Sequence, residues 1–225
     1  MSRLAVLISL VLVTSCSELT EGTGGVVELE VQVPAVPTVE VGEALQLSAR
    51  ALDRDGNAIA VPITWRSSDP LLAVDDAGLV TGVAPGSAEV QAFAGSLASQ
   101  RIPLTVIARA DTLVLAGDSV VIVAPEATAS APLVVQLLSF SQPDPLAARP
   151  VVYTLTSPPD VGPHSVEFPG GVLVDTISTD GSQGLPLNRV PGIASPDTAF
   201  VQVRSYRASG ADVPGSGQRF LVIFQ

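Results

Sequence analysis

The sequence predicts an all-β fold, with two β-sandwich domains in tandem after a cleaved signal peptide. Two observations lead to this prediction. Apolar and polar residues alternate with a period of two over many short stretches, as expected for strands with one buried face. The 225 residues also include 19 glycines and 19 prolines, which are typical of chains with many turns. No stretch after the leader shows the 3.6-residue periodicity of a helix.

The alternation is clearest in short segments separated by turn residues. The residues that share one face of each segment are Leu45, Leu47, Ala49 and Ala51; Ile102, Leu104 and Val106; Val151, Tyr153 and Leu155; and Ala199, Val201 and Val203. The turns are expected at Asp55-Gly56-Asn57, Asp69-Pro70, Ala77-Gly78 and Pro85-Gly86. The chain closes on an apolar strand at Phe220 to Phe224. Short strands at this spacing favour sandwiches.

The first 15 residues have the features of a secretory signal peptide. Arg3 precedes an apolar run from Leu4 to Val13, which is about half the length that a membrane-spanning helix needs. The residues before the single cysteine, Val13-Thr14-Ser15-Cys16, resemble the lipobox of bacterial lipoproteins. That resemblance implies that Cys16 becomes the lipidated first residue, carrying palmitate-type acyl chains, and anchors the protein to a membrane. Ordinary signal cleavage is the alternative, but it would leave an unpaired thiol in an exported protein.

Residues 16–25 are expected to form the lipidated cysteine and a flexible tether of small polar residues. Residues 26–107 carry, in order, Val41-Gly42-Glu43, Asp53 to Asn57, Ile63-Thr64-Trp65 and Gly78 to Gly86. This segment resembles the bacterial Ig-like domain, group 2, of bacterial surface and adhesin-type proteins. The resemblance implies an Ig-like sandwich. Trp65 is expected to place its ring in the core, as in Ig sandwiches generally, with aliphatic packing in place of a disulfide.

A junction at residues 108–110 leads to a second predicted domain at residues 111–225. Arg149 to Tyr153, followed by a turn at Thr179 to Gly184, resembles the bacterial Ig-like group 1 or invasin-type domain. Leu185 stands where that pattern usually has alanine. The second domain is therefore also expected to be an Ig-like sandwich.

Charge and composition exclude several functions. Without the leader, 10 basic residues face 22 acidic ones, a formal charge of −12, which argues against nucleic acid as a partner. The only histidine, His164, lies in a proline-rich segment, so neither a zinc site nor a Ser–His–Asp triad is expected. No cofactor, metal site or catalytic set is predicted. The protein is not expected to be an enzyme.

Two weaker signals concern binding. Asp53, Asp55 and Asn57 have the spacing of half a calcium loop, but Ala58 and Thr64 occupy positions that need glycine and glutamate. A polar hairpin turn is the favoured interpretation, and weak calcium binding between strands stays open. Phe200 and Tyr206 share one strand face and would form a small contact patch if that face is outward.

The functional hypothesis is a non-enzymatic, lipid-anchored protein of the bacterial cell envelope, with Ig-like domains that act as adhesion or spacer modules. Ser17 after Cys16 fits delivery to the outer membrane, on either its periplasmic or its surface face. The expected partners are the membrane, through the lipid, and a protein or glycan at the envelope. The alternative is an accessory subunit of an envelope complex, docked through the C-terminal domain.

Overall fold

The protein consists of β-strands wherever the structure describes it. The computed structural model describes residues 25–157, 165–179, 184–194 and 198–225, and within these ranges every regular element is a strand. The predicted all-β class is therefore confirmed. No helix in the described ranges has the length and apolar character needed to cross a membrane.

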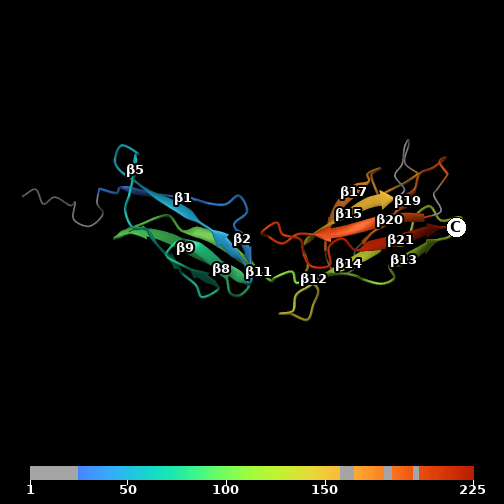
Figure 1. Ribbon diagram of the computed structural model, residues 1–225, viewed down its shortest axis with the longest axis horizontal. Coiled ribbons are helices and arrows are strands. Elements are labelled where there is room, and N and C mark those ends of the chain that lie inside the picture. Colours follow the sequence, from blue (N-terminus) through green and yellow to red (C-terminus); the bar gives the residue numbers. More distant parts are fainter. Residues whose placement is uncertain (1–24, 158–164, 180–183, 195–197) are drawn as a thin grey trace, which may run out of the picture.

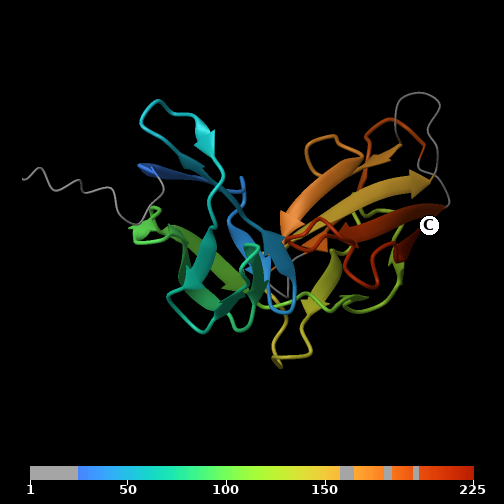
Figure 2. The ribbon, with the colours of Figure 1, turned by 60° about the vertical axis from the view of Figure 1, so that its left-hand side comes forward.

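The buried apolar side chains form two separate clusters. One runs from Val26 to Val106 and the other from Ala110 to Phe224. We call these parts the N-terminal unit and the C-terminal unit. They lie end to end along the longest axis of the molecule, with the C-terminus at the pole farthest from the N-terminal unit (Figure 1). The turned view shows the same two units beside one another (Figure 2), and no sheet runs from one unit into the other.

The N-terminal unit contains three sheets. The first has the order β1-β4-β5, the second β10-β9-β11-β2 with β6 on the other side of β9, and the third β3-β8-β7. The strands are β1 (Glu28–Gln32), β2 (Thr38–Glu40), β3 (Ala44–Gln46), β4 (Ser48–Leu52), β5 (Ala58–Ile59), β6 (Thr64–Ser67), β7 (Leu72–Val74), β8 (Leu79–Gly82), β9 (Gly86–Ala94), β10 (Leu97–Ala98) and β11 (Ile102–Ile107).

Two segments of this unit pass from one sheet to another. The alternating run around Leu47 divides into β3, which pairs with β8, and β4, which pairs with β1. Leu47 lies between them and is 1% exposed, so the inward periodicity continues across the change of sheet. In the same way, β1 pairs antiparallel with β4, while β2 pairs parallel with β11 and matches Glu40 to Ile107. This second change carries the chain to the end of the unit that faces its neighbour.

The C-terminal unit packs a five-stranded sheet, in the order β13-β21-β20-β15-β17, against a three-stranded sheet in the order β12-β14-β18, with β16 and β19 as a separate pair. The strands are β12 (Thr112–Leu115), β13 (Val120–Val123), β14 (Leu133–Leu138), β15 (Pro150–Ser157), β16 (Val166–Glu167), β17 (Val174–Ser178), β18 (Gly184–Leu185), β19 (Asn188–Arg189), β20 (Thr198–Ser205) and β21 (Arg219–Phe224).

Tyr153 joins the two layers of the C-terminal unit. Its ring is fully buried and lies edge-on to Phe168, with ring centroids 6.3 Å apart. Its hydroxyl donates a hydrogen bond to the Leu133 carbonyl of the facing sheet, at 2.8 Å. Burial raises the pKa of this phenol well above its ordinary value. The polar end of the ring is thus satisfied inside an otherwise aliphatic core.

Candidate functional site at the junction of the two units

A cluster of charged side chains lies where the two units meet. Glu40, at the end of β2, has no exposed surface although it is charged. Its pairing position opposite Ile107 places it beside residues 108–110, through which the chain enters the C-terminal unit. A buried carboxylate is costly unless hydrogen bonds and an opposite charge compensate its lost hydration. The contacts of Glu40 provide both.

Among the described residues, the groups that donate hydrogen bonds to the Glu40 side chain lie at the junction or in the C-terminal unit. Arg149 Nη1 donates to its Oε1 at 3.1 Å, and the Ala208 backbone N–H donates to the same oxygen at 3.3 Å. The Ala110 N–H donates to Oε2 at 3.1 Å. The second nitrogen of the guanidinium, Nη2, donates to the Ala108 carbonyl. One buried glutamate therefore holds three segments of the chain together.

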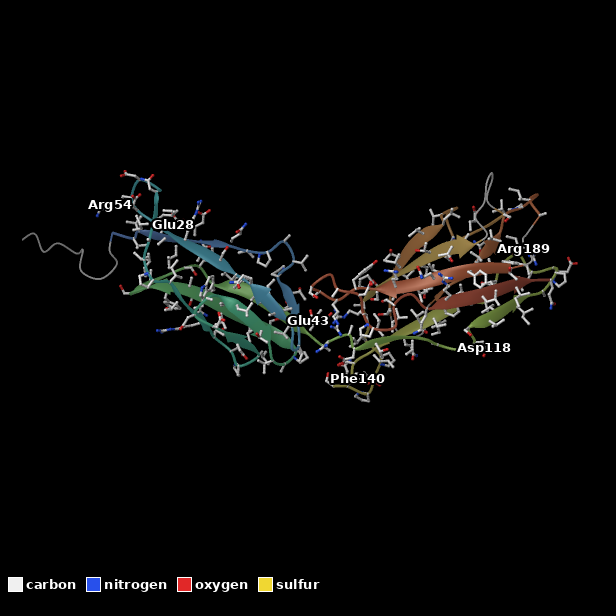
Figure 3. All side chains as sticks on the ribbon, in the orientation of Figure 1. Glu28, Glu43, Arg54, Asp118, Phe140 and Arg189 are labelled. Atoms are coloured by element: carbon white, nitrogen blue, oxygen red, sulfur yellow. The ribbon has the colours of Figure 1, made fainter. Side chains whose placement is uncertain are left out.

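A second ion pair lies next to the first. Arg207 Nη1 is 3.0 Å from Glu43 Oε1, and Arg207 Nε donates to the Ala110 carbonyl at 3.1 Å. The two side chains are only 13% and 15% exposed. Figure 3 shows Glu43 at the end of the N-terminal unit that faces its neighbour. The N-terminal unit thus contributes two carboxylates, and the C-terminal unit contributes two guanidiniums.

The cluster connects the two units through hydrogen-bonded ion pairs. Burying ion pairs adds little net stability over apolar packing, but removing one partner leaves the other charge buried without compensation. Arginine suits such a place because its planar fork donates in several fixed directions. We refer to Glu40, Glu43, Arg149 and Arg207 as the junction clamp.

The residues of the junction clamp were not predicted from the sequence. Strict alternation around Val39 and Val41 would place Glu40 outward, yet Val39 and Glu40 are both buried. Its guanidinium partner is 109 positions further along the chain. The available signal was a lone glutamate between two valines, and an exposed strand would show the same pattern.

Trp65 lies on β6 and is 7% exposed within the apolar cluster of the N-terminal unit. Gly78, in the turn before β8, has a φ of +81°. A Cβ added there would lie 2.8 Å from the Trp65 ring and 2.8 Å from the Leu47 carbonyl oxygen. The turn therefore passes directly over the indole, and only glycine fits between them.

We expect Gly78→Ala to destabilise the N-terminal unit by more than the roughly 1–2 kcal/mol that left-handed backbone strain alone causes. The matched control is Gly56→Ala, because Gly56 has a φ of +79° with nothing within 4 Å of an added Cβ. Urea unfolding of both variants measures the difference. If both variants lose the same free energy of unfolding, the close approach of Gly78 to the Trp65 ring does not affect stability.

The Asp53 segment forms a hydrogen-bonded hairpin turn between β4 and β5. Asp53 Oδ1 accepts the backbone N–H groups of Asn57 and Asp55, each at 2.9 Å. The hydrogen bond from Asn57 is the main cause that lowers the pKa of the Asp53 carboxyl. The side chain therefore stabilises its own turn. In the described ranges, no three histidine, cysteine or acidic residues are grouped to hold a metal ion.

The other residues singled out in the sequence have different outcomes. Cys16 and His164 lie outside the described residues, and the Thr179 to Gly184 turn lies partly outside them. Phe200 is on the outward face of β20 and is partly exposed, whereas Tyr206 follows the end of that strand and is 41% exposed. The outward Phe200 face that the contact patch requires is therefore present, and the patch itself stays a prediction.

A groove of about 590 Å³ lies in the N-terminal unit between β1 and the β10–β11 segment. Its charged residues include Glu28, Glu30 and Arg101. Two of these are engaged in exposed ion pairs, Glu30 with Arg50 at 2.5 Å and Arg101 with Glu89 at 2.8 Å. The lining residues include no histidine or cysteine that could act as a base or a nucleophile.

Taken together, the strand-only architecture and the two sandwich cores define an Ig-like class of protein. Residues 31–106, within the N-terminal unit, match the family described as "Bacterial Ig-like domain (group 2)". The predicted resemblance to this family is confirmed over residues 31–106. No curated protein sequence matches the chain. The resemblance of the second domain to group 1 stays a prediction.

Several solved structures are similar to the chain. The Yersinia pseudotuberculosis adhesin InvE is 13% identical with a TM-score of 0.41, and the match covers 91% of this chain but only 61% of InvE. Domains 4 and 5 of the S-layer protein SbsC are 20% identical over 89% of this chain and 98% of theirs, with a TM-score of 0.33. The Clostridium thermocellum CbhA fibronectin(III)-like modules are 16% identical, with a TM-score of 0.42, and the match covers 88% of this chain and 94% of theirs.

Proposed function

We propose that this protein is a non-enzymatic, lipid-anchored spacer of the bacterial cell envelope, in which two Ig-like domains form one rigid rod. The junction clamp carries this proposal, because a buried Glu40 bonded to Arg149 holds the domains at a fixed angle. The described chain begins beside β1, at the pole opposite the C-terminus (Figure 1). A lipid on Cys16 would thus hold the C-terminal domain away from the membrane.

The family of the first domain supports the envelope location. Domains resembling bacterial Ig-like group 2 occur in bacterial surface and adhesin-type proteins, and the leader ending in Val13-Thr14-Ser15-Cys16 provides an export and anchoring signal. The outer membrane is the proposed destination. A protein or glycan at the envelope is the proposed partner of the C-terminal domain.

The anchor is tested by intact mass and membrane partitioning of the natively expressed protein beside its Cys16→Ala variant. We expect a parent chain that starts at Cys16, carries added acyl mass and sediments with the outer membrane. The variant should lose the acyl mass and the membrane association. An unmodified parent chain in the soluble fraction would overturn the lipid anchor.

A further inference from the structure

The outer edge of β13 is an open strand edge. Among the described residues, β13 pairs only with β21, in parallel. Leu221 N donates to the Ser119 carbonyl at 2.8 Å, and Gln225 N donates to the Val123 carbonyl at 3.0 Å. Backbone groups alternate in direction along a strand, so those of Val120 and Ile122 point away from β21. They form a row of donors and acceptors ready for another strand.

The residues of β13 do nothing to block such pairing. The strand reads Val-Val-Ile-Val, without charge, proline or glycine. Two other edge strands of the molecule carry such protective residues. Exposed Glu28 and Glu30 lie on β1, and Asp175 lies on β17 at the opposite edge of the same sheet. Since natural proteins protect their free edges in this way, the unprotected β13 edge suggests a binding edge.

An apolar outer face accompanies the open edge. Val120 is 45% exposed and Ile122 is 61% exposed. The strand register places Val120 beside Leu221 and Leu221 beside Phe200, and it places Ile122 beside Ile223. The three neighbouring side chains are themselves partly exposed. The apolar contact patch around Phe200 therefore extends through Leu221 to Val120 at the edge of the sheet, and not toward Tyr206.

We propose that a second copy of this chain occupies the edge, with the two β13 strands antiparallel about a two-fold axis through Val121. In this register Val120 is opposite Ile122 of the partner subunit, and these outward-pointing residues exchange backbone hydrogen bonds. The two five-stranded sheets then become one continuous sheet. The apolar outer faces of both copies also join at the axis.

The edge is self-complementary in this register, because the outward backbone groups of Val120 and Ile122 pair with each other across the axis, and the nearby charges are compatible with it. With the axis at Val121, Asp118 lies opposite Ala124, and no like charges meet. Moving the axis to Ile122 would place Asp118 opposite Glu126, which is unfavourable between directly paired strands. Figure 3 shows Asp118 on the outside of the C-terminal unit. This self-association goes beyond the proposed spacer role and does not depend on the lipid.

Analytical ultracentrifugation of the full exported chain carrying Cys16→Ser tests the pairing without the lipid. We expect a mass twice that of the same chain with Ile122→Lys, because lysine blocks the edge and charges the apolar face. The control Val174→Lys, on β17 at the opposite edge and 54% exposed in the parent, should leave the dimer intact. Equal melting of the two lysine variants shows that both are folded. A parent that sediments as a monomer, as it would if a different protein used this edge, overturns the proposal.

A disulfide test gives an independent answer if Ile122→Lys fails to fold. In the proposed register, Val121→Cys faces the same residue of the partner subunit with the Cα atoms about 4.5 Å apart, within disulfide range. Val120→Cys would be displaced along the strand to about 8–9 Å from its copy, beyond that range. We expect oxidised dimers from the first variant only. Equal or absent cross-linking in both variants would contradict the register.

Discussion

Trp65→Ala should strongly destabilise the N-terminal unit. Truncating a large buried aromatic residue costs about 3–5 kcal/mol, and small domains have only about 5–15 kcal/mol of stability to lose. Trp65 is 7% exposed and packs beneath Gly78, so little of the resulting cavity can be filled by the rigid turn above it. The single cysteine leaves no internal disulfide to compensate. Calorimetry of the exported chain measures the loss as a lowered unfolding temperature.

The matched control is Phe140→Ala, because Phe140 is 83% exposed in a loop of the other unit. A surface truncation of this kind is expected to change stability by less than about 0.5 kcal/mol. If Trp65→Ala melts like the parent, the indole does not support the core and the packing described here is wrong.

Glu40→Ala should release the two units from each other. The substitution leaves the Arg149 guanidinium, 12% exposed, without its carboxylate, and breaking a buried pair in this way costs about 3–5 kcal/mol. If the units separate, the Arg149 guanidinium returns to water. The roughly 3–5 kcal/mol is therefore an upper limit for the loss of stability. We expect calorimetry to show two independent transitions in the variant and coupled unfolding in the parent.

Two further variants isolate the role of charge and burial. Glu40→Gln keeps the shape and one acceptor, so it should weaken the coupling less than alanine does. Glu89→Ala removes an ion pair with Arg101 whose side chains are 65% and 42% exposed, and it should cost less than about 1 kcal/mol. A Glu40→Ala effect no larger than that of Glu89→Ala would show that the junction clamp does not hold the units together.

The local pattern of the sequence was sufficient to predict the strands. Residues such as Ile102, Leu104 and Val106 are buried in the predicted alternation, because a half-buried strand alternates its faces whatever its partners are. The sheet to which each strand belongs was harder to predict. The run through Leu47 looks like one strand in the sequence but serves two sheets, since the break depends on pairing with β8 and β1.

The candidate site was missed because it depends on contacts between distant residues. Each member of the junction clamp alone resembles an ordinary surface charge, and Glu43 is separated from Arg207 by 164 positions. Pairing of this kind leaves no periodic signal. The open edge of β13 was also hidden, because the run Val120 to Val123 reads equally well as a central strand and as an edge strand.

Single-molecule fluorescence energy transfer between the two units tests the rigid spacer most directly. Dyes at Arg54→Cys and Val174→Cys, in the full chain with Cys16→Ser, report the separation of the units at dilutions where copies do not associate. The junction clamp predicts one narrow transfer peak for the parent and a broad or shifted distribution for Glu40→Ala. A broad distribution that is the same with and without Glu40→Ala would contradict a fixed junction and, with it, the rod.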